Sequence, residues 1–393
     1  MTEMDLSRRA SLAGLLAATA TPVLAKPAKA LKAVGRWSEV EAQARKMVAD
    51  KLTPGVQISV RRHGATVFSK GFGMANLETA TPVTPASVFR AGSITKQFTA
   101  SAILQLAQEG KLSLDDTLAK YLPDFPNAER LVLRRMLSHT SGLGNNTESN
   151  PLLALQESRT DWTTTQLYDL QKPAGQKLAY EPGTAWLYSN TAFILLGIIV
   201  ERLENQAYAK VVQRRFFDPV GLTHTAVDDA TTVAPNRASG YSSALKSPSG
   251  FVNASFISMS ITGGAGSLRS TAEDLCAWHG ALLGGKVLQP ASLKAMTTPV
   301  TLNDGALPTQ TNAKGEKQPV RYGFGVYLDV VDGHPSVAHN GHIQGFISYL
   351  ETLTDAEVTF AVQINTDGFY APKALATAPD DLNKAIRKAT LAG

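Results

Sequence analysis

Apolar and polar residues follow patterns that divide the chain into elements. Residues 37–52 have apolar positions at helical spacing, which predicts a first helix. Residues 55–61 and 65–72 are β-rich runs joined at His63-Gly64, which predicts a hairpin. Helical spacing returns over residues 94–108. The first part of the chain is therefore predicted to form a helix, a hairpin and a second helix.

The pattern changes in the middle of the chain and again near its end. From about residue 114 to residue 241 it is mostly helical and rich in loops, with candidate helices at residues 131–138, 163–170, 191–203 and 208–217. β-Rich runs then return at residues 320–331, 336–339, 344–353 and 358–364. Turns between these runs are predicted at Asp332-Gly333, Gly341 and Asp355. A last helix is predicted over residues 373–389.

This order of elements predicts an α+β fold. Both ends of the chain are expected to contribute strands to one antiparallel sheet flanked by helices. Residues of about 114–241 are expected to form a mostly helical inserted lobe within a single domain of residues 26–393. Ligand sites favour boundaries of this kind, so we expect the functional site between the sheet and the lobe.

Composition is that of an ordinary globular protein. Of 393 residues, 44% are hydrophobic and 18% are charged, which is enough for a sizeable core. The net charge is +5, but the basic residues are scattered, which indicates a solvated surface and no nucleic-acid partner. Cys276 is the only cysteine, so no intrachain disulfide can form. It lies in a predicted amphipathic helix over residues 272–278, where a buried core thiol is expected.

The N-terminus has the pattern of a targeting segment. Arg8-Arg9 precedes a short apolar run over residues 12–24, and small residues precede Lys26. Residues 1–25 are therefore predicted to be a secretory signal of the twin-arginine type, with export to the periplasm. The alternative is an apolar N-terminal helix that stays attached. No later segment is apolar enough to predict a membrane span.

Gly92-Ser93-Ile94-Thr95-Lys96 is the first candidate for chemistry. A serine hydroxyl needs a proton acceptor before it becomes a good nucleophile. Residues three apart share one face of a helix, which places Lys96 beside Ser93. Free backbone N–H groups at the start of the helix would also point toward an oxygen of a group bonded to Ser93. Taken alone, the motif is equally that of a helix cap followed by a solvated lysine.

Tyr188-Ser189-Asn190 is the second candidate, just before a predicted helix. A tyrosine close to an ammonium group is expected to have a lowered pKa, and it can then act as general base and general acid. The Asn190 amide can donate to a substrate carbonyl and contact Lys96. The alternative is a core aromatic residue followed by a helix cap.

His339-Asn340-Gly341-His342 is the third candidate, at the end of a predicted strand. Gly341 would let a substrate backbone approach closely. The N–H of His342 can join the N–H of Ser93 in an oxyanion hole. His339 and His342 have no carboxylate or cysteine pattern around them, so no metal site is predicted. The alternatives are a neutral histidine at a strand end and a turn residue.

In this order and at this separation, the three motifs resemble the active-site set of the β-lactamase-related serine hydrolases. That group holds class C β-lactamases, D-alanyl-D-alanine carboxypeptidases, D-aminopeptidases and related esterases. The resemblance runs from about residue 40 to about residue 390. Connecting stretches also match, namely residues 110–116, 121–123, 137–143, 181–183, 219–222 and 263–267.

The resemblance implies a role for each residue. Ser93 would attack a carbonyl and form an acyl-enzyme, Lys96 and Tyr188 would share the proton transfers, and Asn190 would orient the substrate. His339 stands where many β-lactamases have a lysine, and Asn340 where threonine or serine is common. A histidine can be uncharged near neutral pH, so both departures weaken the recognition of a substrate carboxylate.

We therefore expect a cofactor-free hydrolase for a small ester, amide or D-amino-acid peptide, with peptidoglycan fragments as a further partner class. A class C-like β-lactamase and a non-catalytic binding or scaffold relative are the alternatives. His139 is expected to be structural, holding the loop after residues 131–138. The glycine run at residues 263–266 is expected to pack a strand edge beside the active-site cleft.

Overall fold

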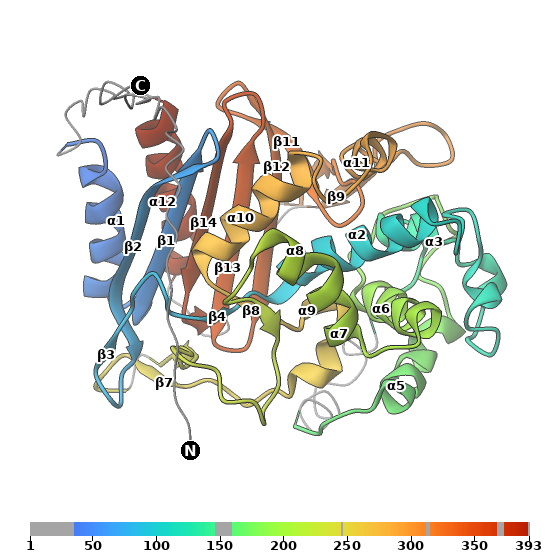
Figure 1. The fold of residues 1–393 in the computed structure, drawn as a ribbon, viewed down its shortest axis with the longest axis horizontal. Helices are drawn as coiled ribbons and strands as arrows, with labels where there is room; N and C mark the ends of the chain where they lie inside the picture. The colour runs from blue at the N-terminus through green and yellow to red at the C-terminus, as the bar shows by residue number, and fades with distance from the viewer. Residues whose placement is uncertain (1–34, 146–158, 245–246, 312–314, 368–372, 392–393) are drawn as a thin grey trace, which may run out of the picture.

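The fold is built on a seven-stranded antiparallel sheet with the order β11-β12-β13-β14-β1-β2-β3 (Figure 1). The computed structural model describes residues 35–145, 159–244, 247–311, 315–367 and 373–391. The strands of this sheet are β1 (Gly55–Arg62), β2 (Ala65–Asn76), β3 (Thr81–Pro82), β11 (Tyr327–Val331), β12 (His334–Ile343), β13 (Phe346–Leu353) and β14 (Val358–Ile364). β1 pairs with β14, so the two ends of the chain meet at the centre of the sheet.

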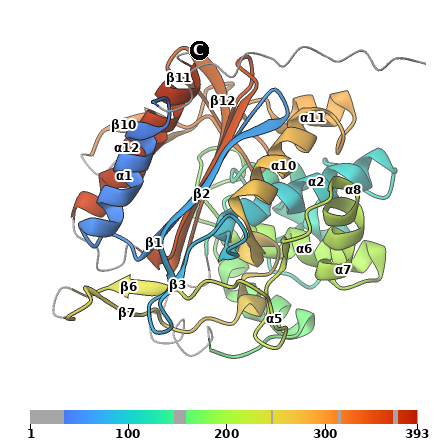
Figure 2. The ribbon, with the colours of Figure 1, turned by 60° about the vertical axis from the view of Figure 1, so that its left-hand side comes forward.

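Helices cover both faces of this sheet. α1 (Ser38–Ala49) and α12 (Lys373–Leu391) lie side by side on one face, and α10 (Ala272–Leu283) lies on the other (Figure 2). The buried residues of α1 are Val40, Ala44 and Met47, which recur at helical spacing and explain why this sequence packs as a helix on the sheet. Cys276 in α10 is a fully buried free thiol, as its position in the apolar pattern predicted.

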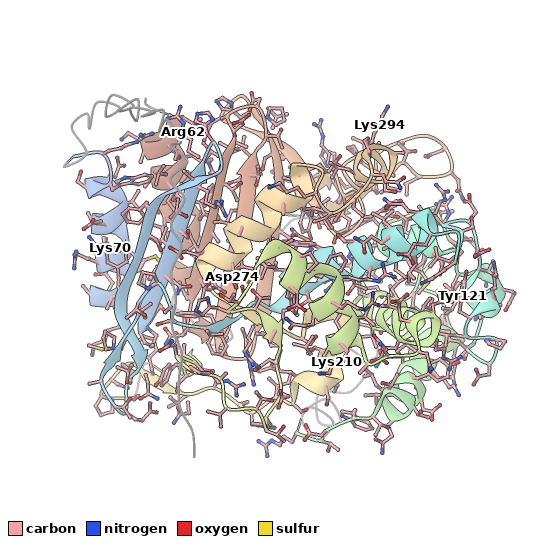
Figure 3. All side chains as sticks on the ribbon, in the orientation of Figure 1. Arg62, Lys70, Tyr121, Lys210, Asp274 and Lys294 are labelled. Carbon is pink, nitrogen blue, oxygen red and sulfur yellow. The ribbon has the colours of Figure 1, made fainter. Side chains whose placement is uncertain are left out.

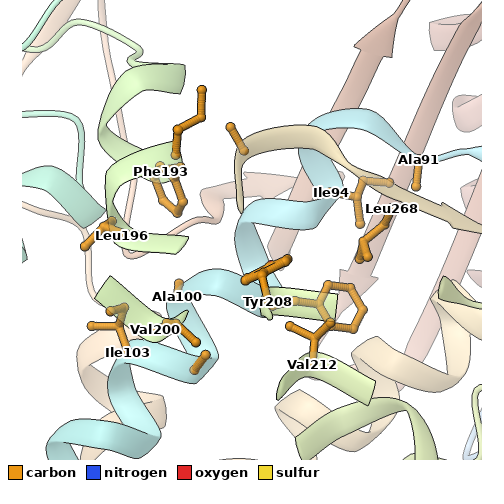
Figure 4. Packing of buried hydrophobic residues seen from close by; sticks show 14 of the residues in the cluster. Ala91, Ile94, Ala100, Ile103, Phe193, Leu196, Val200, Tyr208, Val212 and Leu268 are labelled. Carbon is orange, nitrogen blue, oxygen red and sulfur yellow. The ribbon is translucent and has the colours of Figure 1, made fainter. Parts of the chain in front are cut away.

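The remaining helices form a lobe beside the sheet. They are α2 (Thr95–Gln108), α3 (Leu133–Leu137), α5 (Thr164–Gln176), α6 (Asn190–Glu204), α7 (Tyr208–Val212), α8 (Asp218–Val220), α9 (Gly263–Gly266) and α11 (Pro290–Met296). α2 runs through the lobe, and Figure 4 shows Ala100 and Ile103 of this helix beside Leu196 and Val200 of α6. Thus α2 and α9 pack with the helices of residues 114–241 although both lie outside that range.

Three small sheets complete the structure, and one of them leads into the site. β4 (Phe89–Arg90), β8 (Leu268–Ser270) and β5 (Ala226–Val227) form the sheet just before Ser93. The others contain β15 (Thr366–Asp367), β6 (Tyr241–Ser243) and β7 (Phe251–Asn253), and β9 (Thr309–Thr311) and β10 (Lys317–Pro319).

The α+β class and the antiparallel sheet are confirmed, but two strand predictions are wrong. Of residues 320–331 only the last five form β11, because Gly323 packs against the Met296 carbonyl and Gly325 has a φ of +74°. Gly341 lies inside β12, and the turn falls at Gly345, where φ is +79°. The glycine run at residues 263–266 forms the short helix α9, and not a strand edge.

Basic side chains are spread over several elements of the structure. Lys70 on β2, Lys210 on α7 and Lys294 on α11 lie far apart (Figure 3), in keeping with the scattered basic residues of the sequence. The predicted signal, residues 1–25, lies outside the described residues. Among the residues placed in the structure, no helix has the length and apolar character needed to cross a membrane.

Candidate active site

Ser93 lies where a strand turns sharply into a helix. β4 leads through Ala91 and Gly92 into a short 3-10 helix, Gly92–Ile94, which continues directly as α2. Gly92 has a φ of +53°, a conformation that glycine adopts without a steric penalty. Ser93 is partly exposed at this turn, whereas its neighbours on both sides are buried. The nucleophile predicted from the sequence is therefore accessible on an otherwise buried segment.

Lys96 reaches Ser93 from the first turn of α2. Its Nζ lies 3.1 Å from Ser93 Oγ, 2.8 Å from Asn190 Oδ1 and 2.8 Å from the carbonyl oxygen of Ala265. Burial lowers the pKa of Lys96 well below its ordinary value of 10.5. A neutral amine has two N–H groups, which the two carbonyl oxygens can accept, and its lone pair then faces the Ser93 hydroxyl. The short helix α9 thus contributes to the site through Ala265.

The pKa of Tyr188 is shifted in the direction opposite to the prediction. Burial raises the pKa of the Tyr188 hydroxyl well above its ordinary value of 10, although its hydrogen bond with Ser93 acts in the opposite direction. The predicted lowering required an ammonium group close to the phenol oxygen. Instead, Lys96 Nζ lies over the aromatic ring, 4.7 Å from its centroid, and its own pKa is lowered. Tyr188 is therefore protonated and a hydrogen-bond donor at neutral pH.

Asn145 is a residue of the site that sequence reasoning missed. Its side chain accepts from the Asn190 N–H at 2.6 Å and donates to the Tyr188 carbonyl at 3.0 Å. These two bonds fix the backbone on both sides of Ser189, whose hydroxyl caps α6 by accepting from the N–H of Ala192. Asn145 lies two residues after the family-like stretch that ends at residue 143, which was the available signal.

His139 does more than hold the loop after residues 131–138. Its Nδ1 accepts from the Ser189 N–H at 3.1 Å, and its ring lies 4.4 Å from that of Tyr188 and 4.8 Å from that of Tyr322. Burial lowers the pKa of His139 well below 6.5, so the ring is neutral and carries its proton on Nε2. Across the described part of the chain, this buried Nε2 has no hydrogen-bond partner.

His339 is packed among aromatic side chains. Its ring neighbours those of Tyr188, Tyr322 and Tyr327. The Nδ1–H donates to the Asn340 carbonyl at 2.6 Å, and Nε2 accepts from the Tyr322 hydroxyl at 3.0 Å. Burial, with a smaller effect of nearby Lys96, lowers the pKa of His339 to about 3. The imidazole is therefore uncharged at neutral pH, unlike a lysine in this place.

Gly341 is a glycine for a reason that the sequence did not indicate. A Cβ on Gly341 would meet the Ala91 carbonyl oxygen and Ser348 Oγ well inside 3.0 Å, a separation that real Cβ atoms essentially never show. Ser348 Oγ donates to that same carbonyl at 2.8 Å. The sequence predicts that this glycine admits a substrate backbone, but in the structure the chain segment before the nucleophile occupies this space.

The two residues beside Gly341 point away from His339. Asn340 and His342 are exposed and alternate along β12 with the buried His339 and Gly341. The main-chain nitrogen of His342, however, would lie 3.1 Å from a Cβ built on Gly92. The strand therefore brings the predicted second oxyanion donor next to the turn that holds Ser93.

The edge of β12 beside the nucleophile is not covered by the neighbouring strand. β11 pairs only with residues 334–338 of β12, whereas β13 pairs with residues 336–343. The arrangement thus combines an accessible serine, a buried amine whose pKa is lowered, a phenol donor and adjacent main-chain N–H groups. Such a set can attack a carbonyl carbon and stabilise the oxyanion that forms. No group of His, Cys, Asp and Glu side chains that could hold a metal ion occurs in the ranges that the structure covers.

Comparisons with known proteins agree with this geometry. A family model described as "Beta-lactamase" matches residues 40–381. "Protein flp" from Staphylococcus aureus (strain N315) is 26% identical over 325 residues, which are 81% of this chain and 61% of that protein. This chain therefore aligns with about three fifths of the relative's length.

Two solved structures share the fold over most of both chains. The D-amino acid amidase from Ochrobactrum anthropi SV3, complexed with L-phenylalanine amide, has a TM-score of 0.76 and 24% identity, covering 90% of this chain and 98% of its own. The D-stereospecific amidohydrolase from Streptomyces sp. has a TM-score of 0.71 and 28% identity, covering 86% and 97%.

Proposed function

This chain belongs to the beta-lactamase family, and we propose that it is a serine hydrolase that cleaves an ester or amide bond through an acyl-enzyme on Ser93. The observation that carries the proposal is the surrounding of Lys96. Its Nζ lies 3.1 Å from the Ser93 hydroxyl and 2.8 Å from each of two carbonyl oxygens, with no carboxylate among its hydrogen-bond partners in the described ranges. This arrangement supports a neutral amine that accepts the serine proton.

In acylation, Ser93 Oγ bonds to the substrate carbonyl carbon while its proton moves to Lys96 Nζ. The N–H groups of Ser93 and His342 hold the oxyanion of the tetrahedral intermediate. Tyr188, protonated and hydrogen-bonded to Ser93, donates a proton to the leaving oxygen or nitrogen as its bond to carbon breaks. The Lys96 ammonium then returns a proton to Tyr188, so both groups regain their starting states.

Deacylation repeats these steps with water as the nucleophile. Lys96, neutral again, accepts a proton from the water as it attacks the acyl carbon. The bond between the acyl carbon and Ser93 Oγ breaks as Tyr188 donates its proton to that oxygen, and the Lys96 ammonium then returns a proton to Tyr188. A carboxylic acid leaves, and no cofactor takes part in this sequence.

We propose that His339 and Asn340 recognise no substrate carboxylate, and that the substrate is an ester or a D-amino-acid amide or peptide. His339 is uncharged and Asn340 points to the other face of β12, so neither supplies a fixed positive charge at the site. The amidohydrolase from Streptomyces, 28% identical to this chain, is described as D-stereospecific. Peptidoglycan fragments, which contain D-amino acids, fall within the same proposed class.

Parallel assays test the proposal. The purified protein should hydrolyse a nitrophenyl butyrate ester or a D-amino-acid anilide much faster than a chromogenic cephalosporin. The Ser93→Ala variant should fold with an unchanged melting temperature and turn over none of them. Fast cephalosporin hydrolysis would instead identify a β-lactamase. Full activity of Ser93→Ala, or no labelling of Ser93 by a fluorophosphonate, would refute the acyl-enzyme.

We also propose that the protein is exported to the periplasm. The support is the pattern of residues 1–25, in which Arg8-Arg9 precedes an apolar run. Replacing both arginines by lysine should leave a tagged precursor inside the cell, whereas the unchanged chain should appear in the periplasmic fraction. Equal fractionation of both would contradict the twin-arginine route.

A further inference from the structure

A cavity of about 290 Å³ lies beside the strand that leads to the nucleophile. Its walls include Arg90 of β4, Arg269 of β8, Arg237 and Asp228. Phe89 and Phe346 add an apolar side. For scale, an engineered apolar cavity of about 150 Å³ accepts a benzene molecule. The cavity is therefore large enough for a small organic group. The charged side chains in its wall determine which chemical class of group it can bind.

Three arginines share one carboxylate in this wall. Arg90 Nε lies 2.9 Å from Asp228 Oδ2, while Arg237 Nη2 and Arg269 Nη1 lie 2.6 and 2.9 Å from Oδ1. The Asp228 side chain is only 1% exposed, so solvent does little to screen it. Three guanidinium groups and one carboxylate leave two positive charges at the cavity.

Most of the guanidinium donors remain free. Each arginine has five N–H groups. Within the described ranges, Arg90 donates only through Nε, Arg269 only through Nη1, and Arg237 only through Nη2, which also reaches the Asp229 carbonyl at 3.0 Å. In the described ranges, no other nitrogen of Arg90 or Arg269 is both buried and unpaired, and Arg237 is an exposed residue. Unused donors are therefore available to an anion that enters the cavity.

A purely structural ion cluster would be more nearly balanced. Around Arg387, for comparison, the carboxylates of Glu351 and Asp332 both pair with a single arginine. The single carboxylate of Asp228 balances one of the three guanidinium charges, so the remaining positive charges repel each other unless an anion is present. Planar guanidinium groups match carboxylate and phosphate oxygens in a bidentate geometry.

We propose that this cavity binds a carboxylate or phosphate group. Arg90 is three residues before Ser93, and an extended chain spans at most about 3.6 Å per residue, so their Cα atoms are no more than about 11 Å apart. Gln344, also in the wall, is two residues after His342. An acidic group on a substrate bound at Ser93 can therefore reach this anion site. Binding of an acidic substrate group rests on the proposed function, whereas binding of a free anion does not.

A binding experiment tests the anion site independently of catalysis. Inorganic phosphate is titrated by calorimetry at constant ionic strength, against chloride, into the unchanged protein and into Arg269→Gln and Arg237→Gln. Arg134→Gln is the matched control, since Arg134 pairs with exposed Asp115 away from the cavity. We expect saturable binding that weakens at least tenfold in the two cavity variants and is unchanged in the control. No saturable binding, or equal binding by all four proteins, would overturn the proposal.

A kinetic experiment separates the two sources of the anion. Nitrophenyl esters of pentanoate and of glutarate differ by a terminal carboxylate. If the substrate supplies the anion, kcat/KM for the glutarate ester should fall at least tenfold in Arg269→Gln, with the pentanoate ester unaffected. An unchanged ratio together with lost phosphate binding identifies a free anion. If Arg269→Gln lowers the melting temperature, Arg269→Lys and the more exposed Arg237→Gln provide the same comparison.

Discussion

At the scale of the residue, Lys96 is defined by hydrogen-bond partners that carry no charge. Its hydrogen-bond partners are a serine hydroxyl, an amide oxygen and a main-chain carbonyl, all of them neutral. An ammonium in this buried place would lose its hydration without gaining an ion pair. The neutral amine is therefore the favoured form, and Tyr188, whose pKa is raised, is left as the proton donor.

The pH dependence of kcat/KM should follow the ionisation of Lys96. Because burial lowers the pKa of this lysine below 10.5, activity should rise with pH up to that pKa and then stay level. Tyr188 should cause no decline below pH 10, since its pKa is raised above that value. Lys96→Arg keeps a donor but cannot accept the proton, so kcat should fall by about 10²–10⁴-fold. Near-normal turnover by Lys96→Arg at pH 7 would exclude Lys96 as the base.

His139 should position Tyr188 through the Ser189 N–H. Asparagine at this place offers an oxygen close to Nδ1 and tolerates the φ of +61°, so His139→Asn should fold and keep much of its activity. His139→Leu leaves a buried N–H unpaired and a strained backbone, which together cost on the order of 3 kcal/mol. Its kcat should fall well below that of His139→Asn, with KM little changed, in assays on one nitrophenyl ester. Equal kcat for both variants would contradict this role.

At the scale of the element, β12 and the turn before α2 are fitted to each other. Gly341 lies against the Ala91 carbonyl, and Ser348 of β13 donates to that carbonyl at 2.8 Å. The strand therefore holds the backbone just before Ser93 in place, and Gly92 brings the nucleophile close to His342. Packing at this contact determines whether both oxyanion donors can reach one oxygen atom.

Gly341→Ala should separate these two elements. The new Cβ meets a backbone oxygen that cannot rotate away, so we expect a loss of about 3 kcal/mol in unfolding free energy and at least a hundredfold loss in kcat. Gly280→Ala is the matched control, because Gly280 lies in α10 and an added Cβ would meet no atom within 4 Å beyond its chain neighbours and the backbone of its own helix. There alanine should be neutral or stabilise by up to about 1 kcal/mol. Equal effects in denaturant titrations would show that the contact at Gly341 is unimportant.

At the scale of the whole molecule, three neutral histidines are buried in the core. His139, His279 and His339 each have a pKa lowered by burial, to about 3 for the last two. His279 links α10 to α2 and β13 through Gln97 at 3.0 Å and Thr352 at 2.9 Å. The unfolded chain binds protons at all three positions below pH 6.5, while the folded chain does not.

Acid should therefore destabilise the fold before the carboxylates titrate. Since the unfolded state binds more protons between pH 6.5 and the lowered values, unfolding free energy should fall as pH falls through this window. With three protons the slope approaches about 4 kcal/mol per pH unit. Urea titrations at pH 8, 7, 6 and 5 measure it, and above pH 7.5 only the lowered pKa of Lys96 should add a further rise, of at most about 1.4 kcal/mol per pH unit. Constant stability from pH 8 to pH 5 would mean that these histidines are protonated or exposed.

The sequence by itself determined the elements whose pattern is local. Helical spacing located α1 and α2, β-rich runs located β1, β2 and β14, and the apolar context of Cys276 indicated a buried thiol. The three motifs also identified the family, because their order and separation are properties of the chain. Periodicity failed at residues 320–326, where packing of Gly323 and Gly325 against other segments prevents a strand.

Only the tertiary structure decided how the site residues behave. The directions in which the pKa values of Lys96 and Tyr188 shift depend on the groups that surround them. The sequence predicted a charged Lys96 beside the Tyr188 hydroxyl, whereas in the structure Lys96 Nζ lies over the Tyr188 ring. Asn145 enters the site through contacts 43 and 45 residues away along the chain. Arg90 and Arg269 meet Asp228 from separate strands for the same reason. Local spacing cannot specify such contacts, because chain folding alone brings these atoms together.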